Sequence, residues 1–128
     1  MGENAISGDV VDAALKVHRA LGPGMLESAY EMILAHELAT RGHEVVRQVL
    51  IPVRYEGVEF QNGFRADLLV DELVMVELKS IEQVLAVHKK QLLTYLRFGR
   101  KRLGLLLNFG AARLKDGGII RLVNGLPD

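Results

Sequence analysis

The fold is decided by residues 65–79, which read RADLLVDELVMVELK. Two apolar runs in this stretch flank a short polar turn, a pattern typical of two paired β-strands. Three charged residues, Asp67, Glu77 and Lys79, stand where the pattern calls for buried side chains. Charged groups rarely enter a protein interior unless they are paired or bind a metal. The stretch therefore predicts two strands that carry a polar site.

The length of the turn decides whether the two carboxylates meet. Residues two apart in a strand share a face, so Glu77 and Lys79 point the same way. A two-residue loop would place Asp67 opposite Val76 and turn Glu77 away, because a one-residue slip exchanges the faces. A three-residue loop, Asp71 to Leu73, places Asp67 opposite Glu77. We therefore predict the three-residue loop, or a bulge with the same effect.

The rest of the chain alternates between helix-like and strand-like periods. The spacing of apolar residues predicts helices over residues 9–21, 25–41 and 84–98. Strand-like composition predicts strands over residues 45–55, 58–60, 64–70, 73–79, 103–108 and 119–123, the last at a sheet edge. This order predicts an α/β or α+β fold in which helices flank a mixed sheet. A chain of 128 residues suits one domain, residues 1–128.

Composition narrows the chemistry. The chain has no cysteine, which excludes disulfides, thiolate zinc sites and thiol catalysis. A metal would be held by oxygen or imidazole, which favours magnesium, manganese or calcium. The N-terminus lacks a signal-peptide pattern, and no apolar run is long enough to span a bilayer. We therefore expect a cytoplasmic protein without a membrane partner.

Net charge is zero, but the two signs are separated along the chain. Residues 1–83 hold 14 acids and 7 bases, whereas residues 84–128 hold 2 acids and 9 bases. A basic stretch can follow a phosphate backbone. We predict nucleic-acid contacts for six of its residues: Lys89, Lys90, Arg97, Arg100, Lys101 and Arg102. The alternative is that this stretch pairs with the acidic half, within one chain or between the subunits of a homodimer.

Asp67, Glu77 and Lys79 together predict a divalent-metal site that cuts phosphodiester bonds. Paired carboxylates bring a cation to the scissile phosphate, where it stabilises transition-state charge and lowers the pKa of bound water. A lysine beside them can orient the attacking water or neutralise developing charge. The alternative is a buried ion pair between Glu77 and Lys79 without a ligand, although such pairs contribute little to stability.

Polar residues on two predicted helices could border this site. His88, Gln91 and Tyr95 share the core-facing side of the third helix. Gln91 could hold a water or a phosphate oxygen, and His88 could do the same or donate a proton. Simple packing is the alternative for His88 and Tyr95. Glu27 shares a face with Tyr30, but its place in the first turn of the second helix favours a purely stabilising role.

The sequence resembles a known family. Residues 24–30, GMLESAY, fit the GxxExxY signature of a family of small bacterial proteins, which itself resembles the PD-(D/E)xK nuclease superfamily. Asp67, followed by Glu77-Leu78-Lys79, is similar to the core motif of that superfamily, with Ala66 in place of the proline. Further similarity lies in residues 64–70, 88–96 and 105–110, so the resemblance extends from Val10 to Val123.

The resemblance implies a restriction-endonuclease-like core and a set of site residues. Asp67 and Glu77 would bind Mg²⁺ or Mn²⁺, and Lys79 would be the catalytic lysine. The backbone carbonyl of Leu78 would complete the metal shell, and Glu27 matches the acidic residue that an early helix supplies as a further ligand or as a contact that supports the ligands. Gln91, which matches a glutamine on the following helix, would be a further catalytic residue, and supporting roles would fall to His88, Tyr95 and Tyr30.

These observations lead to one hypothesis and two alternatives. We expect a magnesium-dependent nuclease that acts on DNA, alone or within a homodimer or larger assembly. Its intrinsic sequence specificity should be low, because a core of this size has no separate recognition domain. The first alternative is a nucleic-acid-binding or interaction module that retains the site without cutting. The second is metal-dependent hydrolysis of a small nucleotide.

Overall fold

Five strands form one mixed sheet in the computed structural model, which describes residues 2–127 except for the side chain of Asn62. The strands β3 and β4 are parallel, and every other neighbouring pair is antiparallel. The mixed sheet predicted from the sequence is therefore confirmed. In sheet order the strands are β1 (Val45–Tyr55), β2 (Val58–Val70), β3 (Val74–Lys79), β4 (Leu103–Asn108) and β5 (Ile119–Val123).

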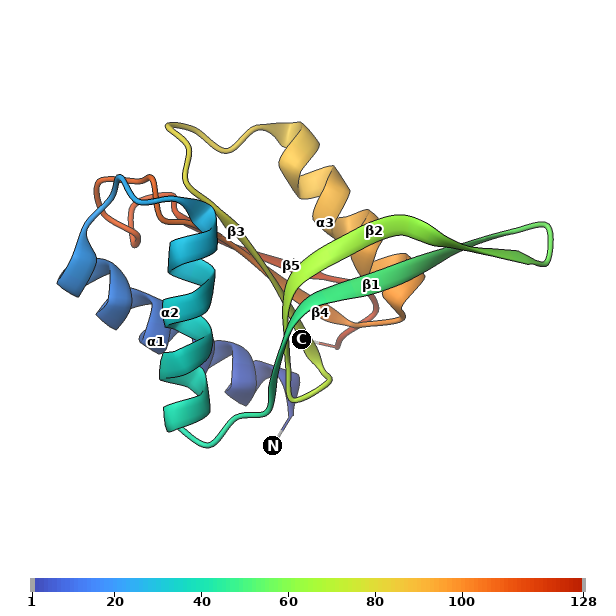
Figure 1. The fold of residues 1–128 in the computed structure, drawn as a ribbon, viewed down its shortest axis with the longest axis horizontal. Helices are drawn as coiled ribbons and strands as arrows, with labels where there is room; N and C mark the ends of the chain where they lie inside the picture. Colours follow the sequence, from blue (N-terminus) through green and yellow to red (C-terminus); the bar gives the residue numbers. More distant parts are fainter. Residues whose placement is uncertain (1, 128) are drawn as a thin grey trace.

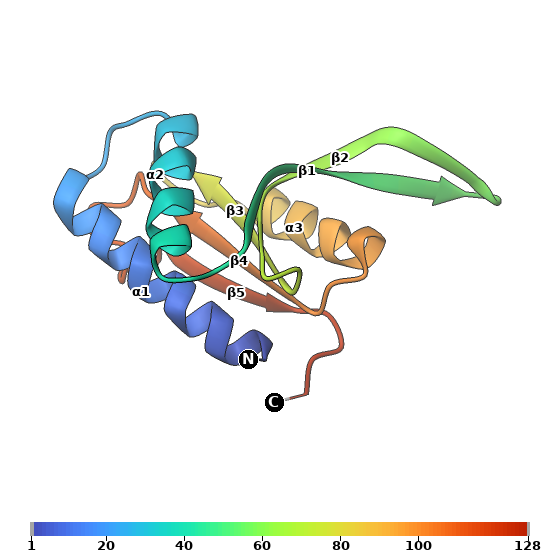
Figure 2. The same ribbon diagram turned by 60° about the horizontal axis from the view of Figure 1, so that its bottom comes forward.

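Three helices cover the two faces of this sheet: α1 (Glu3–Leu21), α2 (Glu27–Thr40) and α3 (Ala86–Gly99). Figures 1 and 2 show α1 and α2 together on one face and α3 on the other. Strand side chains alternate between these layers, as a two-residue period requires. Val74, Val76 and Leu78 pack with α1 and α2, whereas Met75 packs with α3. This α+β architecture is consistent with the expected restriction-endonuclease-like fold.

Strand β4, which lies between β3 and β5, is buried along its whole length, because helices lie on both faces of the sheet. This arrangement explains the almost purely apolar run Leu103–Asn108. β5 lies at the sheet edge beside β4, as predicted. Since β3 and β4 are parallel, their carboxyl ends, Lys79 and Asn108, lie together at the same edge of the sheet. No helix within residues 2–127 is long and apolar enough to cross a membrane.

The first helix begins at Glu3, six residues before the predicted start at Asp9. Gly8 obscured this turn in the sequence, because glycine in a helix interior costs about 1 kcal/mol relative to alanine. Burial outweighs that cost. Ile6 is almost completely buried in the core between the helices and the sheet, and it continues the apolar face that Val10 carries.

The predicted strands 58–60 and 64–70 form one continuous strand, β2, so their separation was wrong. β1 and β2 make a long hairpin that extends away from the rest of the sheet (Figure 1). Glu56 and Gly57 form its turn, as predicted, and both have the positive φ that a tight hairpin turn demands. The register shifts between Ile51 and Val53, which marks a bulge in the hairpin.

Candidate functional site

The β2–β3 connection has the predicted length. Val70 pairs with Val74, and the N–H of Leu73 donates to the Val70 carbonyl at 3.0 Å, which leaves the three-residue loop Asp71–Leu73. The pairing continues to Leu68 opposite Val76. The next position in this register places Asp67 opposite Glu77. The loop prediction is therefore confirmed, and the two carboxylates share one face of the sheet.

Asp67 and Glu77 each bond to the backbone of the other strand. Glu77 Oε1 accepts the backbone N–H of Asp67 at 3.3 Å, and Asp67 Oδ2 accepts the backbone N–H of Leu78 at 2.8 Å. Only 7% of Glu77 is exposed, whereas Asp67 is partly exposed. At the point where β2 leaves β3, these side-chain bonds thus take the place of the backbone hydrogen bonds between the two strands. They also hold the two carboxylates in position.

Burial raises the pKa of Glu77 to about 9, and the hydrogen bond and negative charge of Asp67 act in the same direction. The positive charge of Lys79 lowers it by less. At neutral pH Glu77 is therefore protonated when no cation is bound, because two adjacent carboxylates cannot both remain charged in a buried site. A divalent cation would reverse this preference by favouring the ionised form of both groups.

A backbone carbonyl faces the same space. In a strand, the N–H and C=O of one residue point to the same side, and the N–H of Leu78 points to Asp67. The Lys79 carbonyl points the other way, since it accepts the N–H of Phe109 at 2.8 Å. The Leu78 carbonyl therefore faces Asp67, beyond the end of the β2–β3 ladder. Two carboxylates and this carbonyl form an oxygen donor set that suits Mg²⁺ or Mn²⁺.

Glu27 reaches the same strand end without joining the carboxylate pair. Glu27 Oε2 accepts the backbone N–H of Ser80 at 3.2 Å, and the hydroxyl of Ser80 donates to the Met25 carbonyl at 2.8 Å. Within residues 2–127, no three carboxylate or imidazole side chains gather into a ready-made cation site. The structure thus gives Glu27 an anchoring contact between α2 and the end of β3, and it does not assemble the expected third carboxylate ligand.

Tyr30 fixes the turn that precedes α2. Its hydroxyl donates to the Gly22 carbonyl and accepts the N–H of Met25, the latter at 3.2 Å. Its ring is fully buried and stacks on Phe109, with 4.5 Å between the ring centroids. Tyr30 therefore joins the α1–α2 connection to the residue that follows β4. This contact is structural.

The three polar residues of α3 have different surroundings. Tyr95 is buried against Phe64, with ring centroids 4.9 Å apart. Burial raises the pKa of Tyr95, and the carboxylates of Glu77 and Asp67 raise it further. Gln91 is exposed. His88 accepts the backbone N–H of Leu85 through Nδ1 at 2.9 Å, which starts the helix at Ala86, two residues later than predicted.

Sequence reasoning missed a buried carboxylate beside the site. Glu31 is only 4% exposed. Its Oε2 accepts from Arg47 Nε at 3.0 Å and its Oε1 from Gln48 Nε2 at 2.5 Å. The same Gln48 nitrogen lies 3.4 Å from Asp67 Oδ1. The helical spacing of Glu27 and Glu31 was a readable signal, but the left-handed backbone of Gln48, with φ 54° inside β1, was not.

The predicted basic surface is divided between two ends of the sheet. Lys89, Lys90 and Arg97 are exposed on α3, and the first two lie in the half that follows the carboxyl end of β3. Arg100, Lys101 and Arg102 lie beyond the far end of α3, about 20 Å along a helix of this length. Arg102 also pairs with Glu3 at 2.8 Å. For Arg102, this ion pair agrees with the alternative that the basic stretch pairs with the acidic half of the same chain.

Similarity to known proteins identifies the family of this chain. The sequence model of the PD-(D/E)XK nuclease superfamily matches residues 4–122. The chain belongs to this superfamily. No curated protein and no solved structure shows a significant match to the chain. Family and fold together support a nuclease-like function, and proteins of this superfamily generally use divalent metals and act on nucleic acid.

Proposed function

We propose that this protein is a divalent-metal-dependent nuclease that hydrolyses phosphodiester bonds in DNA with low intrinsic sequence specificity. The observation that carries the proposal is the contact between Asp67 and Glu77 across β2 and β3. Ionising the buried carboxylate of Glu77 beside that of Asp67 is costly unless a cation compensates for the charge. We further propose that the chain belongs to the GxxExxY family, on the residues Gly24, Glu27 and Tyr30.

The residues of this chain divide the work of the reaction. Asp67, Glu77 and the Leu78 carbonyl would hold Mg²⁺ or Mn²⁺. When bound, the cation supplies charge stabilisation at the scissile phosphate and a more acidic bound water. Lys79 shares the sheet face of Glu77 and is partly exposed, so its ammonium group can donate to a phosphate oxygen or orient the attacking water.

In this proposal the first half of α3 contacts the bound DNA strand. Gln91 is exposed on this helix, where its amide can donate to a phosphate oxygen. Lys89 and Lys90 are exposed beside it and would pair with flanking phosphates. Arg97 extends this surface along the helix. Arg102 is excluded from the proposed surface because it is paired with Glu3.

The experiment is a cleavage assay on single- and double-stranded DNA and RNA with Mg²⁺, Mn²⁺ or chelator. Wild-type protein should cut DNA in the presence of metal. Asp67→Ala and Lys79→Ala should each reduce the rate at least a hundredfold, the scale on which a single electrostatic contributor acts. Arg54→Gln, on the exposed β1–β2 hairpin, is the matched control and should leave the rate unchanged. Undiminished cleavage by Asp67→Ala or Lys79→Ala protein would exclude this site.

A second function is favoured by one observation. Since no third carboxylate or imidazole joins Asp67 and Glu77 in the described part of the chain, the metal site is incomplete without substrate, water or a partner. A module of this kind could bind nucleic acid without cutting it. This alternative would be supported if the protein binds DNA or RNA in chelator and cleaves neither of them with any metal.

A further inference from the structure

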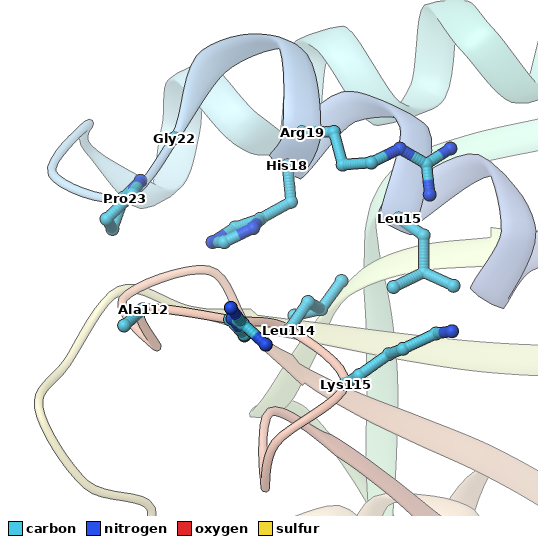
Figure 3. A pocket seen from close by; sticks show the side chains of 9 residues that line it. Leu15, His18, Arg19, Gly22, Pro23, Ala112, Leu114 and Lys115 are labelled. Carbon is cyan, nitrogen blue, oxygen red and sulfur yellow. The ribbon is translucent and has the colours of Figure 1, made fainter.

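A cavity of about 460 Å³ lies between the end of α1 and the loop that follows β4. Figure 3 shows His18 reaching from α1 toward that loop, with Leu114 and Lys115 across the opening. Its polar lining side chains are His18, Arg19, Arg113 and Lys115, and none of its lining residues, all within the described range, is acidic. Leu15, which is partly exposed, provides apolar surface, and Leu114 lies behind the lining in the core. The volume lies within the range of small-molecule sites.

Within residues 2–127, the cations around this cavity have no carboxylate partner. In the part of the chain that the structure describes, none of the ion pairs involves Arg19, Arg113 or Lys115. Other basic residues do have such partners: Arg41 pairs with three carboxylates, for example. Like charges around one hollow repel each other and attract anions. The cavity is therefore an electropositive site without an internal counter-charge.

The walls of the cavity are fixed by hydrogen bonds. His18 is 7% exposed, and its Nε2 donates to the Ala111 carbonyl at 2.9 Å. The other wall is held by Asn108, whose Oδ1 accepts the N–H of Ile81 at 3.1 Å and of Gly110 at 3.0 Å. Asn108 Nδ2 also donates to the Ile81 carbonyl at 3.0 Å. These bonds tie the loop that follows β4 to the carboxyl end of β3, where Lys79 lies.

We propose that this cavity binds the phosphate group of a nucleotide, either free or within a nucleic-acid strand. Arg19, Arg113 and Lys115 would contact the phosphate oxygens, since guanidinium and ammonium groups are the side chains that bind phosphate most strongly. Leu15, which is partly exposed, would contact the apolar surface of the sugar or base. In its strand-bound form the inference rests on the proposed nuclease function, because the cavity would then hold a phosphate away from the cleaved bond.

The experiment measures binding in chelator, so that neither metal nor catalysis contributes. The probes are inorganic phosphate, deoxyadenosine monophosphate and an eight-nucleotide oligodeoxyadenylate. The test variant is Arg113→Gln/Lys115→Gln, in which both substituted side chains are exposed. The control variant is Lys16→Gln/Arg54→Gln, which removes the same charge from exposed side chains elsewhere. Circular dichroism and thermal unfolding verify that both variants are folded.

The test variant should bind at least one nucleotide probe about tenfold more weakly than wild type, while the control binds like wild type. If the strand is the ligand, the dependence of log K on log salt for the oligonucleotide should become shallower by about 1.4, the value for losing two phosphate contacts on a single strand. If the test variant loses affinity tenfold for the monophosphate alone, the ligand of the cavity is a free nucleotide. Equal binding of both nucleotide probes by wild type and test variant would overturn the proposal.

The two proposals fail separately. Asp67 does not line the cavity, so the outcome at one site does not decide the outcome at the other. A protein that binds through Arg113 and Lys115 but never cuts DNA would support the cavity and contradict the nuclease. A protein that cuts DNA, but whose binding of both nucleotide probes is unchanged by the two substitutions, would support the nuclease and contradict the cavity.

Discussion

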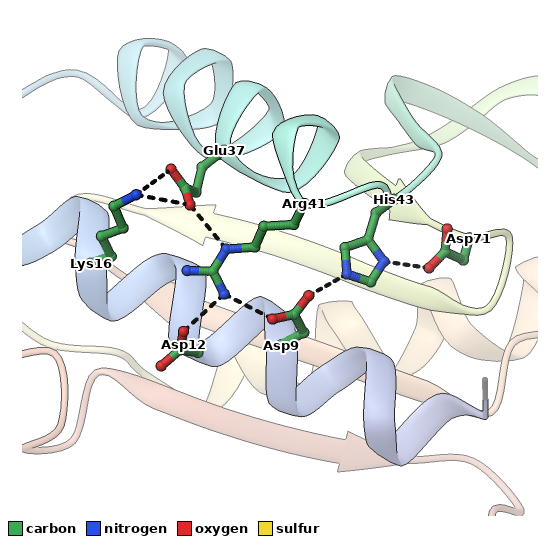
Figure 4. A network of polar contacts seen from close by, with 7 residues as sticks. All are labelled: Asp9, Asp12, Lys16, Glu37, Arg41, His43 and Asp71. Carbon is green, nitrogen blue, oxygen red and sulfur yellow. Dashed lines mark hydrogen bonds and ion pairs between the residues drawn. The ribbon is translucent and has the colours of Figure 1, made fainter.

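His43 and Asp71 form a hydrogen bond of 2.6 Å between Nδ1 and Oδ2. The other ring nitrogen of His43 contacts Asp9, so the imidazole lies between two carboxylates, one from α1 and one from the β2–β3 loop (Figure 4). The N–H of Glu44 donates to Asp71 Oδ1 at 2.8 Å. This contact ties the loop that sets the Asp67–Glu77 register to the start of β1.

The His43 contact predicts pH-dependent stability. The hydrogen bond and charge of Asp71, followed by those of Asp9, raise the pKa of His43 above its ordinary value of 6.5. A raised pKa in the folded state stabilises the protein fully below pH 6.5, and this contribution is lost as pH rises through the folded-state pKa. The urea midpoint of wild type should therefore fall above pH 6.5 more steeply than that of His43→Asn. His36→Asn, on the exposed side of α2, should retain the wild-type slope.

The Glu77 pKa predicts a second pH effect in the absence of metal. A pKa raised from 4.5 to about 9 stabilises the protein below pH 4.5, and this contribution is lost as pH rises toward 9. Glu77→Gln should therefore be more stable than wild type at pH 8 in chelator, and the difference should grow by up to about 1.4 kcal/mol per pH unit between pH 5 and pH 8. Chemical unfolding at pH 5 and pH 8 measures the difference. A variant less stable than wild type at pH 8 would contradict the protonated state of Glu77.

Metal binding should release a proton from the same group. Because Glu77 is protonated at pH 7.5 and a ligating carboxylate is ionised, binding of Mn²⁺ should release about one proton. Calorimetry in two buffers of different ionisation enthalpy gives this number. Glu77→Gln should release none, and Glu59→Gln on the exposed hairpin should behave like wild type. Binding by wild type without proton release would place the metal elsewhere.

Glu31 should act on the reaction through Gln48. The Glu31 carboxylate holds the Gln48 amide near Asp67, so Glu31→Gln should misplace Asp67 and reduce kcat about tenfold with little change in KM. The apparent affinity for Mn²⁺ should fall in parallel. Gln48→Ala should have the same effects if the amide transmits the change. An unaltered kcat in Glu31→Gln protein would limit Glu31 to its contact with Arg47.

The Tyr30 hydroxyl should contribute to stability more than to chemistry. Tyr30→Phe keeps the stacking on Phe109 but removes the bonds to Gly22 and Met25. Loss of a buried hydroxyl and its partners costs about 1–2 kcal/mol. Urea unfolding measures the loss. Tyr55→Phe, where the side chain is 65% exposed, is the control and should be within about 0.5 kcal/mol of wild type.

The sequence predicted well the elements whose period is strong. The bounds of β1, β4 and β5 agree with the structure, and the three-residue loop followed from the demand that Asp67 face Glu77. The start of α1 was missed because Gly8 interrupts the helical pattern. β2 was divided because polar residues occupy the exposed hairpin arm, where no core imposes a period.

The surroundings of the site were harder to predict than its centre. Asp67 and Glu77 are neighbours through local strand pairing, which a register argument can follow. Glu31 and Gln48 approach Asp67 from α2 and β1. Their contact depends on how the helix lies on the sheet and on one left-handed residue, and neither has a period in the sequence. For the same reason the cavity between α1 and the loop after β4 had no sequence signal.

The projecting β1–β2 hairpin makes the molecule easy to label. Its outer end contributes no residue to the cavity and none to the Asp67–Glu77 pair. Because the chain has no cysteine, a single Glu59→Cys substitution would create a unique thiol on this arm. A fluorophore or surface tether attached there would leave the sheet edge near Lys79 facing solution, so strand binding could be followed on immobilised or single molecules.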